Sequence, residues 1–361
     1  MNFIDLKKQN FRIKTEIDKA IDQVLSHGQF IQGPEVSLLE KKLEKYSGSK
    51  KCISVANGTD AILISLLALG VKEGDEVIMP AFNYVSAAET VSMLGAKPVF
   101  VDVEFDTFNI DPIEIEKVIS DKTNLIISTS LFGQCANFKS INDIASKHNL
   151  PVLEDAAQSF GASHYDKKSC NLTTIATTSF FPAKPLGCYG DGGAIFTNDE
   201  NLAKKINKIS KHGQSKKYHH EMIGVNSRLD TLQAAILLEK LKIFESEIQE
   251  KNKIACLYSN FFEEKGLNLH PKIKKENKSV YAQFTCVSDN REKILEALKK
   301  NEIPFALYYP LPLHNQQAYL NRDVQLKNSE NLSNMTFSLP MHAYLTDQEI
   351  ENITNIIHSA F

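Results

Sequence analysis

The chain has 361 residues, of which 42% are hydrophobic and 24% charged, and its formal net charge is −3. This composition is typical of a globular protein with a large core, and the nearly balanced charge disfavours nucleic acid as a partner, which leaves a small molecule. Because no apolar run has the length of a signal core or membrane span, and the six cysteines form no C-x-x-C pair, we expect a cytoplasmic protein without a disulfide framework or zinc site.

Short apolar runs and helical patterns alternate through the first two thirds of the chain. Strands that are joined through crossing helices form a largely parallel sheet, so this order predicts an α/β fold. The helical patterns are clearest at residues 60–69, 85–94 and 140–148. The seven runs expected as strands are residues 52–55, 76–79, 98–101, 125–128, 151–153, 176–181 and 193–196.

The pattern changes after residue 228. Residues 228–261 have the pattern of one charged helix that is long enough to bridge two domains. The remainder combines a strand pattern at 281–287 with helical patterns at 291–300 and 346–358. We therefore expect a large domain over residues 1–240 and a smaller C-terminal α+β domain over residues 241–361.

The residues directly after each strand are candidate site residues, because open α/β sheets bind ligands beyond the carboxyl ends of their strands. The first run is followed by N-G-T-D-A. Gly58 permits a tight backbone there, and Thr59 begins a helix whose free amides could bind a phosphate. The alternative is an ordinary helix cap formed by Thr59 or Asp60.

Aromatic and carboxylate side chains follow two further runs. Phe82 and Tyr84 follow the second run, where an aromatic ring could stack on a flat cofactor, although core packing is the more ordinary explanation. The fifth run ends in E-D-A-A-Q-S. The carboxylate of Asp155 could bind a protonated ring nitrogen and the amide of Gln158 could donate to a phenolic oxygen, but helix capping by Asp155 would explain it equally well.

The sixth run brings Ser179 and, five residues later, a lysine in an apolar setting. Lys184 lies between F-F-P-A and P-L-G-C-Y-G-D-G-G. Most lysines are solvated surface residues, but one that is removed from water loses its proton readily and can form a Schiff base. The G-D-G-G segment could also be a simple turn that leads into the next strand.

One cofactor requires all of these groups together. Pyridoxal 5′-phosphate needs a phosphate site, a stacking ring, a carboxylate for its pyridine nitrogen, a donor for its phenolic oxygen and a lysine for its aldehyde. The chain supplies a candidate for each of them at a strand end, so the sequence predicts a pyridoxal phosphate site.

The motifs N-G-T-D-A, E-D-A-A-Q-S and S-F-F-P-A-K-P-L-G-C-Y-G-D-G-G-A resemble, in order and spacing, those of the DegT-type nucleotide-sugar aminotransferases. The resemblance extends from F-I-Q-G-P-E-V through G-V-N-S-R-L-D to Y-Y-P-L-P-L-H-N-Q. It implies the fold of type I pyridoxal-phosphate-dependent transferases, with a mixed, mostly parallel seven-stranded sheet in the large domain. Ser130 stands where many relatives have histidine.

The resemblance also implies roles for individual residues. Lys184 would form the Schiff base with the cofactor and move protons, while Asp155 would keep the pyridine nitrogen protonated. The remaining implied roles are a bond from Gln158 to the phenolic oxygen, ring stacking by Phe82, phosphate binding by Gly58, Thr59 and Ser179, phosphate binding in the neighbouring subunit of a homodimer by Asn226, and sugar-nucleotide contacts by Arg228 and His314.

The implied reaction is a ping-pong transfer of the amino group from L-glutamate to a nucleotide-linked keto sugar. Lysine at position 184, where sugar dehydratases of this fold carry histidine, favours transamination. The form of the lysine motif resembles enzymes that aminate the 3-keto position of UDP-N-acetylglucosamine-type sugars for lipid A or O-antigen synthesis. Alternatives are a 4-keto or dTDP-3-keto substrate, or a regulator that binds the cofactor without turnover. A dinucleotide-dependent dehydrogenase is disfavoured, since no G-x-G-x-x-G follows the first run.

Overall fold

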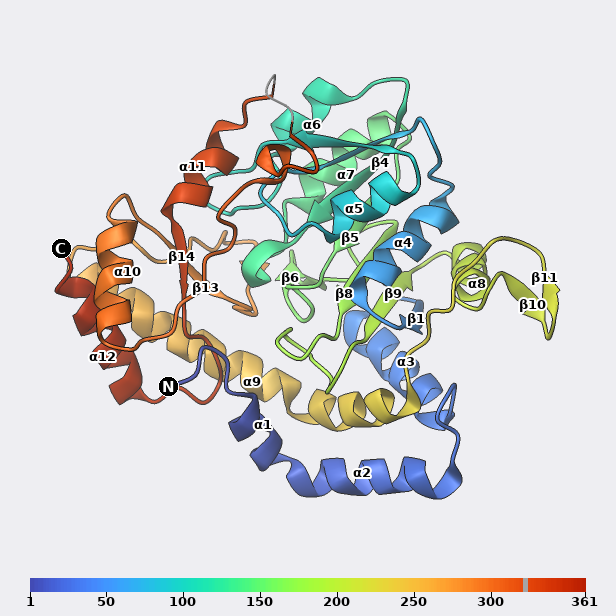
Figure 1. The fold of residues 1–361 in the computed structure, drawn as a ribbon, viewed down its shortest axis with the longest axis horizontal. Coiled ribbons are helices and arrows are strands. Elements are labelled where there is room, and N and C mark those ends of the chain that lie inside the picture. Colours follow the sequence, from blue (N-terminus) through green and yellow to red (C-terminus); the bar gives the residue numbers. More distant parts are fainter. Residues whose placement is uncertain (321–323) are drawn as a thin grey trace.

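A seven-stranded sheet forms the centre of the large domain in this computed structural model, which describes residues 1–320 and 324–361 (Figure 1). The strand order is β1-β9-β8-β5-β4-β2-β3, with β9 antiparallel to both of its neighbours and all other pairs parallel. The seven strands expected from the apolar runs are confirmed. They are β1 (Lys51–Val55), β2 (Glu76–Pro80), β3 (Lys97–Val101), β4 (Thr123–Thr129), β5 (Val152–Asp155), β8 (Ile175–Ser179) and β9 (Gly193–Thr197).

Helices cover both faces of this sheet, which explains why its strands are apolar on both sides. Val152 of β5 belongs to the core on one face, under helices α3 (Pro34–Ser47), α6 (Pro112–Val118), α7 (Phe138–Lys147) and the first half of α9 (Thr231–Glu264). Leu153 belongs to the core on the other face, under α4 (Gly58–Leu69), α5 (Ser86–Met93) and α8 (Glu200–Ile209). Because side chains alternate along a strand, Glu154 and Asp155 point to opposite faces of the sheet.

The small domain is connected to the large one by α9, which has 34 residues (Figure 1). Strands β13 (Phe284–Val287) and β14 (Thr336–Leu339) pair antiparallel, and α10 (Arg291–Lys300) and α12 (Asp347–His358) pack with them around a separate core. Along α9 the large-domain core ends at Ile248 and the small-domain core begins at Ile254. The domain boundary at residues 240/241 stays a prediction.

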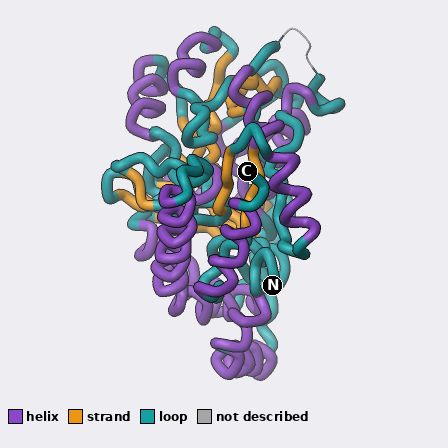
Figure 2. The backbone as a smooth tube through the Cα atoms, turned by 90° about the vertical axis from the view of Figure 1, so that its left-hand side faces the viewer, coloured by secondary structure: helices purple, strands orange, loops and turns teal. Residues whose placement is uncertain are grey.

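The remaining elements surround this frame. Helices α1 (Leu6–Arg12) and α2 (Lys14–His27) lie beside α9. Both ends of the chain lie on the side of the molecule that the small domain occupies (Figure 2). Among the described residues, none of the helices combines the length and apolar character needed to cross a membrane. The other elements are α11 (Lys327–Met335), the short strands β6 (Ser163–His164), β7 (Lys167–Lys168) and β12 (Asn277–Lys278), and the 3-10 helices η1 (Leu131–Gly133) and η2 (Leu313–Asn315).

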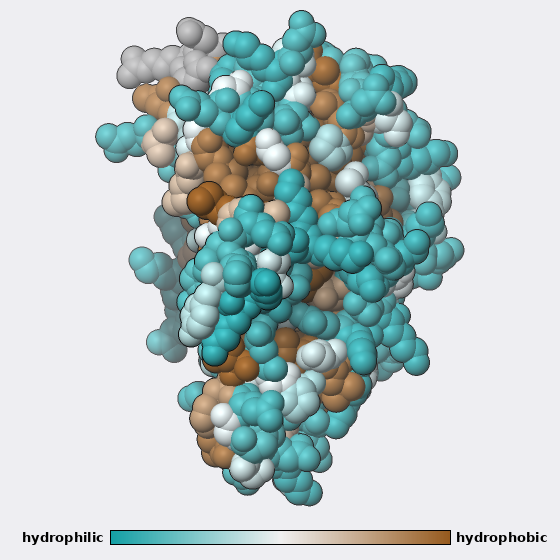
Figure 3. Space-filling model, turned by 90° about the vertical axis from the view of Figure 1, so that its right-hand side faces the viewer, coloured by the Kyte–Doolittle hydropathy of each residue, from teal (hydrophilic) through white to brown (hydrophobic). Residues whose placement is uncertain are grey.

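A hairpin of β10 (Gln214–Lys216) and β11 (His219–His220) projects from the large domain (Figure 1). Tyr218 at its turn and Ile223 beyond it are both exposed. Hydrophobic surface is visible above and below this hairpin in the view that faces it (Figure 3). This face of the large domain therefore exposes apolar side chains to its surroundings.

Candidate active site

A cavity of about 690 Å³ lies at the carboxyl end of the central strands. Its walls come from the segments that follow β1, β2, β5 and β8, together with Ile4 near the N-terminus and a tyrosine pair at residues 308 and 309. Six predicted site residues line it together, namely Gly58, Thr59, Asp155, Gln158, Ser179 and Lys184.

The cap of helix α4 leaves its first amides available to a ligand. Asn57 is the N-cap, and its side chain accepts a hydrogen bond from the Asp60 amide at 2.7 Å. The alternative that Thr59 or Asp60 caps this helix is therefore wrong. The N–H groups of Gly58 and Thr59 precede the first intrahelical bond, so they present free donors and the positive end of the helix dipole to the cavity.

Gly58 also allows the start of this helix to approach β8 closely. A Cβ atom at Gly58 would lie 2.8 Å from the Cβ of Ser179 and 3.3 Å from its hydroxyl oxygen. The absence of a side chain at residue 58 therefore allows the helix amides and the Ser179 hydroxyl to face the same small volume. Backbone amides and a hydroxyl in that arrangement suit a phosphate group.

The loop that carries Lys184 is folded back on itself between β8 and β9. Its base is closed by hydrogen bonds from the Phe180 amide to Gly192 and from the Cys188 amide to Phe180, both at 2.7 Å. A Cβ atom at Gly187 would lie 2.4 Å from the carbonyl oxygen of Pro182, so only glycine fits this return of the chain. The fold of the loop places Lys184 against the cavity wall.

Burial shifts the pKa values of Lys184 and Asp155, and the charge of each residue partly offsets the shift of the other. Burial lowers the pKa of the Lys184 amine below its ordinary value, and the Asp155 carboxylate partly offsets that change. Burial raises the pKa of Asp155, while the Ala157 amide, Lys184 and Thr129 act in the opposite direction. A lysine with a lowered pKa holds more of the neutral, nucleophilic amine at a given pH.

Asp155 and Gln158 are both fixed by the backbone around them. No helix follows β5, so the alternative that Asp155 caps a helix is wrong. The Ala157 amide instead donates to Asp155 Oδ1 at 3.0 Å within a turn. Gln158 Oε1 accepts a hydrogen bond from the Phe132 amide at 2.8 Å, and its Nε2 donates to the Tyr309 hydroxyl at 3.0 Å. The amide group of Gln158 therefore presents its NH₂ side to the cavity.

The prediction that Phe82 stacks on the cofactor is wrong. Its ring is fully buried and packs against Phe108, Phe132 and Tyr309, away from the cavity surface. Tyr84, which is 58% exposed, lines the cavity instead. The sequence presented both aromatics at this edge, and only the path of the chain after β2 decides which one is available for stacking.

Asn226 and Arg228 line a neighbouring cavity of about 540 Å³. Asn57 and Asp191 belong to the walls of both cavities, so the two are adjacent. The backbone of Asn226 forms an antiparallel bridge with Lys211, and its side chain is exposed. In the described chain, neither residue reaches the cavity that Lys184 lines.

The structure does not support a substrate contact by His314. This ring is completely buried in η2, its Nε2 lies 3.1 Å from Glu330 Oε1, and it is not among the residues that line the cavity of Lys184. A side chain without solvent exposure cannot meet a sugar nucleotide in this arrangement. His314 is therefore a core residue that joins η2 to α11.

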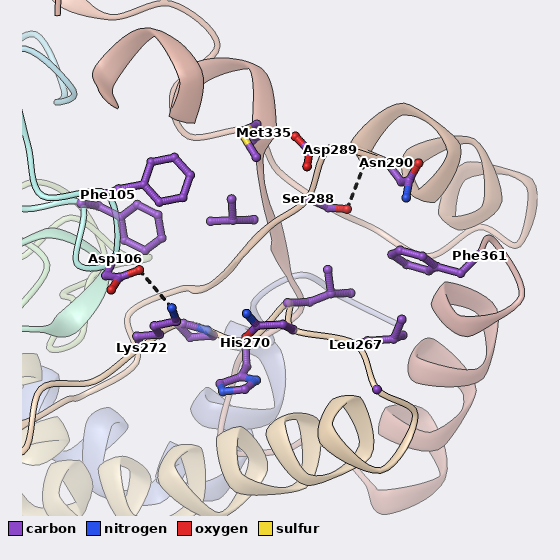
Figure 4. Close-up of a pocket in the computed structure, with 16 residues that line it drawn as sticks. Phe105, Asp106, Leu267, His270, Lys272, Ser288, Asp289, Asn290, Met335 and Phe361 are labelled. Carbon is purple, nitrogen blue, oxygen red and sulfur yellow. Dashed lines mark hydrogen bonds and ion pairs between the residues drawn. The ribbon is translucent and has the colours of Figure 1, made fainter. Parts of the chain in front are cut away.

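Another cavity, of about 420 Å³, lies between the two domains (Figure 4). Phe105, Leu267 and Met335 form part of its walls, and an ion pair of Lys272 with Asp106 at 3.2 Å crosses one side. None of the predicted site residues lines it. The chemistry predicted from the sequence is therefore concentrated in the cavity of Lys184.

The residues around Lys184 fit pyridoxal phosphate. Because residue 58 is glycine, the amides at the start of α4 and the Ser179 hydroxyl can form a phosphate site. Tyr84 provides an aromatic ring, and Lys184 provides an amine with a lowered pKa. Asp155 and Gln158 supply the carboxylate and the amide donor in the same cavity. Sequence reasoning missed Tyr309, which the motif Y-Y-P-L-P-L-H-N-Q contained without indicating its contact with Gln158.

Comparisons with known proteins agree with this arrangement. The sequence model of the DegT/DnrJ/EryC1/StrS aminotransferase family matches residues 12–358. The chain is 55% identical over 353 residues, covering 98% of both sequences, to the UDP-2-acetamido-2-deoxy-3-oxo-D-glucuronate aminotransferase of Pseudomonas aeruginosa.

Solved structures show the same fold. A DegT DnrJ EryC1 StrS aminotransferase from Brucella abortus superposes with a TM-score of 0.96 at 39% identity, covering 99% of both chains. NtdA from Bacillus subtilis with bound cofactor PMP has a TM-score of 0.89 at 31% identity, covering 98% of this chain and 83% of its own. The architecture is thus the α/β fold of aminotransferases that use this cofactor.

Proposed function

The chain belongs to the DegT/DnrJ/EryC1/StrS aminotransferase family, and from that premise we propose that it transfers the amino group of L-glutamate to the 3-keto position of a UDP-linked N-acetylhexosamine-type sugar. The observation that carries this proposal is that Lys184, Asp155 and Gln158 meet in one cavity. The substrate part draws support from the relative that is 55% identical, whose name specifies a UDP-linked 3-oxo sugar.

The enzyme depends on pyridoxal phosphate. When bound, this cofactor supplies an aldehyde that exchanges amino groups and a ring that accepts the electrons released at the neighbouring carbon. In our proposal the Gly58 and Thr59 amides and the Ser179 hydroxyl bind its phosphate. Tyr84 lies against the flat ring in the place that the sequence had assigned to Phe82.

Asp155, Gln158 and Lys184 hold or move protons in the proposed reaction. Asp155 holds the proton of the pyridine nitrogen through its buried carboxylate, and Gln158 donates through Nε2 to the phenolic oxygen. The Lys184 amine would take a proton from the α-carbon of the amino donor and deliver it to the carbon that had been the cofactor's aldehyde carbon. Its lowered pKa suits a group that must accept a proton near neutral pH.

The nucleotide part of the substrate needs cations, and Lys184 is the one lysine or arginine among the described residues that line its cavity. Arg228, which lines the adjacent cavity, is our candidate to bind a diphosphate or a sugar carboxylate. A 6-carboxylate sugar agrees with the name of the Pseudomonas relative, and we place Arg228 against one of these two anionic groups.

We further propose a homodimer in which Asn226 reaches the phosphate site of the partner subunit. Its support is the exposed side chain of Asn226, the adjacency of its cavity to that of Lys184, and the hydrophobic surface around the projecting hairpin (Figure 3). The product would then enter a cell-surface glycan such as lipid A or O-antigen, and the reaction would take place in the cytoplasm.

A mixing experiment tests the shared sites. Lys184→Ala and Asn226→Ala chains are expected to be inactive or weakened alone, but a mixed dimer would hold one complete site if Asn226 acts on its partner. Recovery of activity on mixing supports the arrangement, and a mixture no more active than its components contradicts it.

The substrate is tested by single turnovers. The purified protein is first treated with L-glutamate, which should bleach the visible band of the bound cofactor. It is then given a UDP-linked 3-keto sugar, the corresponding 4-keto sugar, or a dTDP-linked 3-keto sugar, and the aminated product is identified by mass spectrometry. Recovery of the visible band only with the UDP-linked 3-keto sugar supports the proposal. Equal recovery with a 4-keto or dTDP-linked sugar overturns the substrate assignment.

A further inference from the structure

Glu154 is a completely buried carboxyl directly beside Asp155 in the sequence. Because β5 side chains alternate, Glu154 faces the core of α3, α7 and α9, whereas Asp155 faces the cavity. In residues 1–320 and 324–361, Glu154 forms no ion pair with a lysine, arginine or histidine. A buried carboxyl without a cation needs another reason to be tolerated.

Three hydrogen bonds hold this carboxyl. The Ser169 hydroxyl lies 2.7 Å from Oε1, the Cys170 amide donates to Oε2 at 2.8 Å, and the Ser130 hydroxyl lies 3.3 Å from Oε1. Ser130 follows β4, and the other two residues follow β7. Glu154 therefore ties two separate segments to the strand that ends in Asp155.

Both segments support the residues that face the cavity. The Ser130 amide donates to the Asp155 carbonyl oxygen at 3.1 Å, and two residues later the Phe132 amide holds Gln158 Oε1 at 2.8 Å. On the other side, the hydroxyls of Ser169 and Ser159 are 2.9 Å apart, and Ser159 directly follows Gln158. Displacing either segment would move the amide group of Gln158.

The surroundings of Glu154 favour its neutral form. Asp155 is the adjacent acid, and the thiols of Cys135 and Cys170 are the other titratable groups that face it from the neighbouring segments. Burial raises the pKa of Glu154 to about 7 despite its three hydrogen bonds, and the nearby Asp155 acts in the same direction. Either hydroxyl of the Ser159–Ser169 pair can be the donor, so the Ser169 hydroxyl can accept a hydrogen bond from protonated Glu154 as well as donate one to it.

We propose that Glu154 is a positioning residue that works as a neutral acid, anchoring the Ser130 and Ser169 segments so that Gln158 is held in place and the negative charge at the end of β5 stays on Asp155. This inference rests on the proposed roles of Asp155 and Gln158 toward the cofactor. The inference is carried by the positions of the hydrogen bonds, by the opposite directions of the Glu154 and Asp155 side chains, and by the absence of an ion pair to Glu154 within the described residues.

The test compares Glu154→Gln, which keeps the shape and a hydrogen-bonding group, with Ser169→Ala, which removes the shortest bond to the carboxyl. Ser333→Ala is the matched control, because its buried hydroxyl in α11 also makes a local hydrogen bond, to the Ser329 carbonyl oxygen, but neither residue lines the cavity of Lys184. One measurement is the unfolding temperature of each cofactor-free protein between pH 5 and pH 8. The other is the titration of pyridoxal phosphate, followed through its visible absorbance.

The folded-state pKa of Glu154 lies above its ordinary value of 4.5, so the stability contributed by its proton is complete below about pH 4.5 and lost as the pH rises through about 7. Glu154→Gln should therefore unfold at a higher temperature than wild type at pH 8, with a smaller difference at pH 5. It should keep the affinity for pyridoxal phosphate. Ser169→Ala should weaken that affinity about fivefold, the effect of one neutral hydrogen bond, whereas Ser333→Ala should not.

Two outcomes overturn the inference. One is an unfolding temperature of Glu154→Gln that follows wild type in parallel from pH 5 to pH 8, which would show that Glu154 does not carry the proton. The other is an unchanged cofactor affinity in Ser169→Ala. The unfolding measurement uses the cofactor-free protein, so it stands even if wild type fails to turn over with glutamate and the proposed function is wrong.

Discussion

The Gln158 amide donates to the Tyr309 hydroxyl at 3.0 Å inside the cavity that Lys184 also lines. The backbone amide of Phe132 donates to Gln158 Oε1, so the side-chain amide of Gln158 cannot flip without losing that hydrogen bond. Tyr309 thus holds the donor that we assign to the phenolic oxygen of the cofactor. The NH₂ group carries two N–H donors, and the bond to Tyr309 uses one of them, so in our proposal the tyrosine and the cofactor oxygen meet at the same group.

Replacement of Tyr309 tests whether the tyrosine and the cofactor oxygen compete for the NH₂ group of Gln158. Tyr309→Phe should keep the affinity for pyridoxal phosphate or strengthen it by up to about fivefold, whereas Gln158→Leu should weaken it about tenfold, since a charge-assisted bond is lost. Titration of the cofactor into each cofactor-free variant measures both. An equal weakening in the two variants would mean that the Tyr309 hydroxyl itself binds the cofactor.

Lys184 and Lys240 form a matched pair of buried lysines. Burial lowers the pKa of both amines, but only Lys184 lines the cavity. Lys184→Ala should bind pyridoxal phosphate without the wild-type visible spectrum and should show no bleaching with L-glutamate, whereas Lys240→Met should show both. Absorbance spectra before and after glutamate decide the point. Bleaching in Lys184→Ala would remove this residue from the reaction.

Phe82 and Tyr84 should separate stability from cofactor binding. Phe82→Ala leaves a hole in an aromatic cluster and should lower the free energy of unfolding by about 3–5 kcal/mol. Tyr84→Ala should change it by about 0.5 kcal/mol or less, because the ring is largely exposed, yet should release the cofactor more readily. Urea unfolding and dialysis of the loaded enzyme measure the two effects. If cofactor retention falls only in Phe82→Ala, the assignment of the stacking ring to Tyr84 is wrong.

These two aromatics also show where sequence reasoning ends. Mostly apolar runs predicted the seven sheet strands, because a strand covered on both faces has few polar positions. The residues at the strand ends could be predicted for a different reason: the topology of an open α/β sheet brings the carboxyl ends of its strands together. Which of Phe82 and Tyr84 faces the ligand depends on how the chain turns after β2, and no local pattern reports that turn.

Contacts between distant parts of the chain were the other limit. Tyr309 meets Gln158 across 151 positions, and His314 lies in the core although its motif suggested a substrate contact. The two-residue strands β6, β7, β11 and β12 are too short for a period to appear in the sequence. Each of these features follows from tertiary packing, which one sequence without its fold does not report.

Gly58→Ala tests the phosphate site directly. The added methyl group would lie 2.8 Å from the Cβ of Ser179, so α4 must move away from β8. We expect the affinity for pyridoxal phosphate to fall about tenfold or more, with a smaller effect on pyridoxal, which lacks the phosphate. Parallel titrations with the two compounds check this. Equal losses for both would indicate a general distortion of the cavity instead.

Lys240 provides a prediction about pH and stability. It is 2% exposed, and among the described residues its Nζ has no hydrogen-bond partner, although it lies 4.8 Å from the centre of the Tyr189 ring. Burial lowers its pKa to about 8, and Glu247, the carboxylate that partly offsets this change, is already bonded to Gln9 at 2.7 Å. The charged amine is therefore held in a site that does not stabilise its charge well.

The sign of the effect follows from the lowered pKa. Because the folded-state pKa is below the ordinary value of 10.5, the unfolded chain binds this proton more tightly, and the destabilisation is complete below about pH 8 and fades as the pH rises towards 10.5. Lys240→Met should thus raise the free energy of unfolding by up to about 3 kcal/mol at pH 7. The gain should be clearly smaller at pH 9.5. Urea unfolding at the two pH values measures it, and a variant that is less stable than wild type at pH 7 would show that the contact with Tyr189 outweighs the burial of the charge.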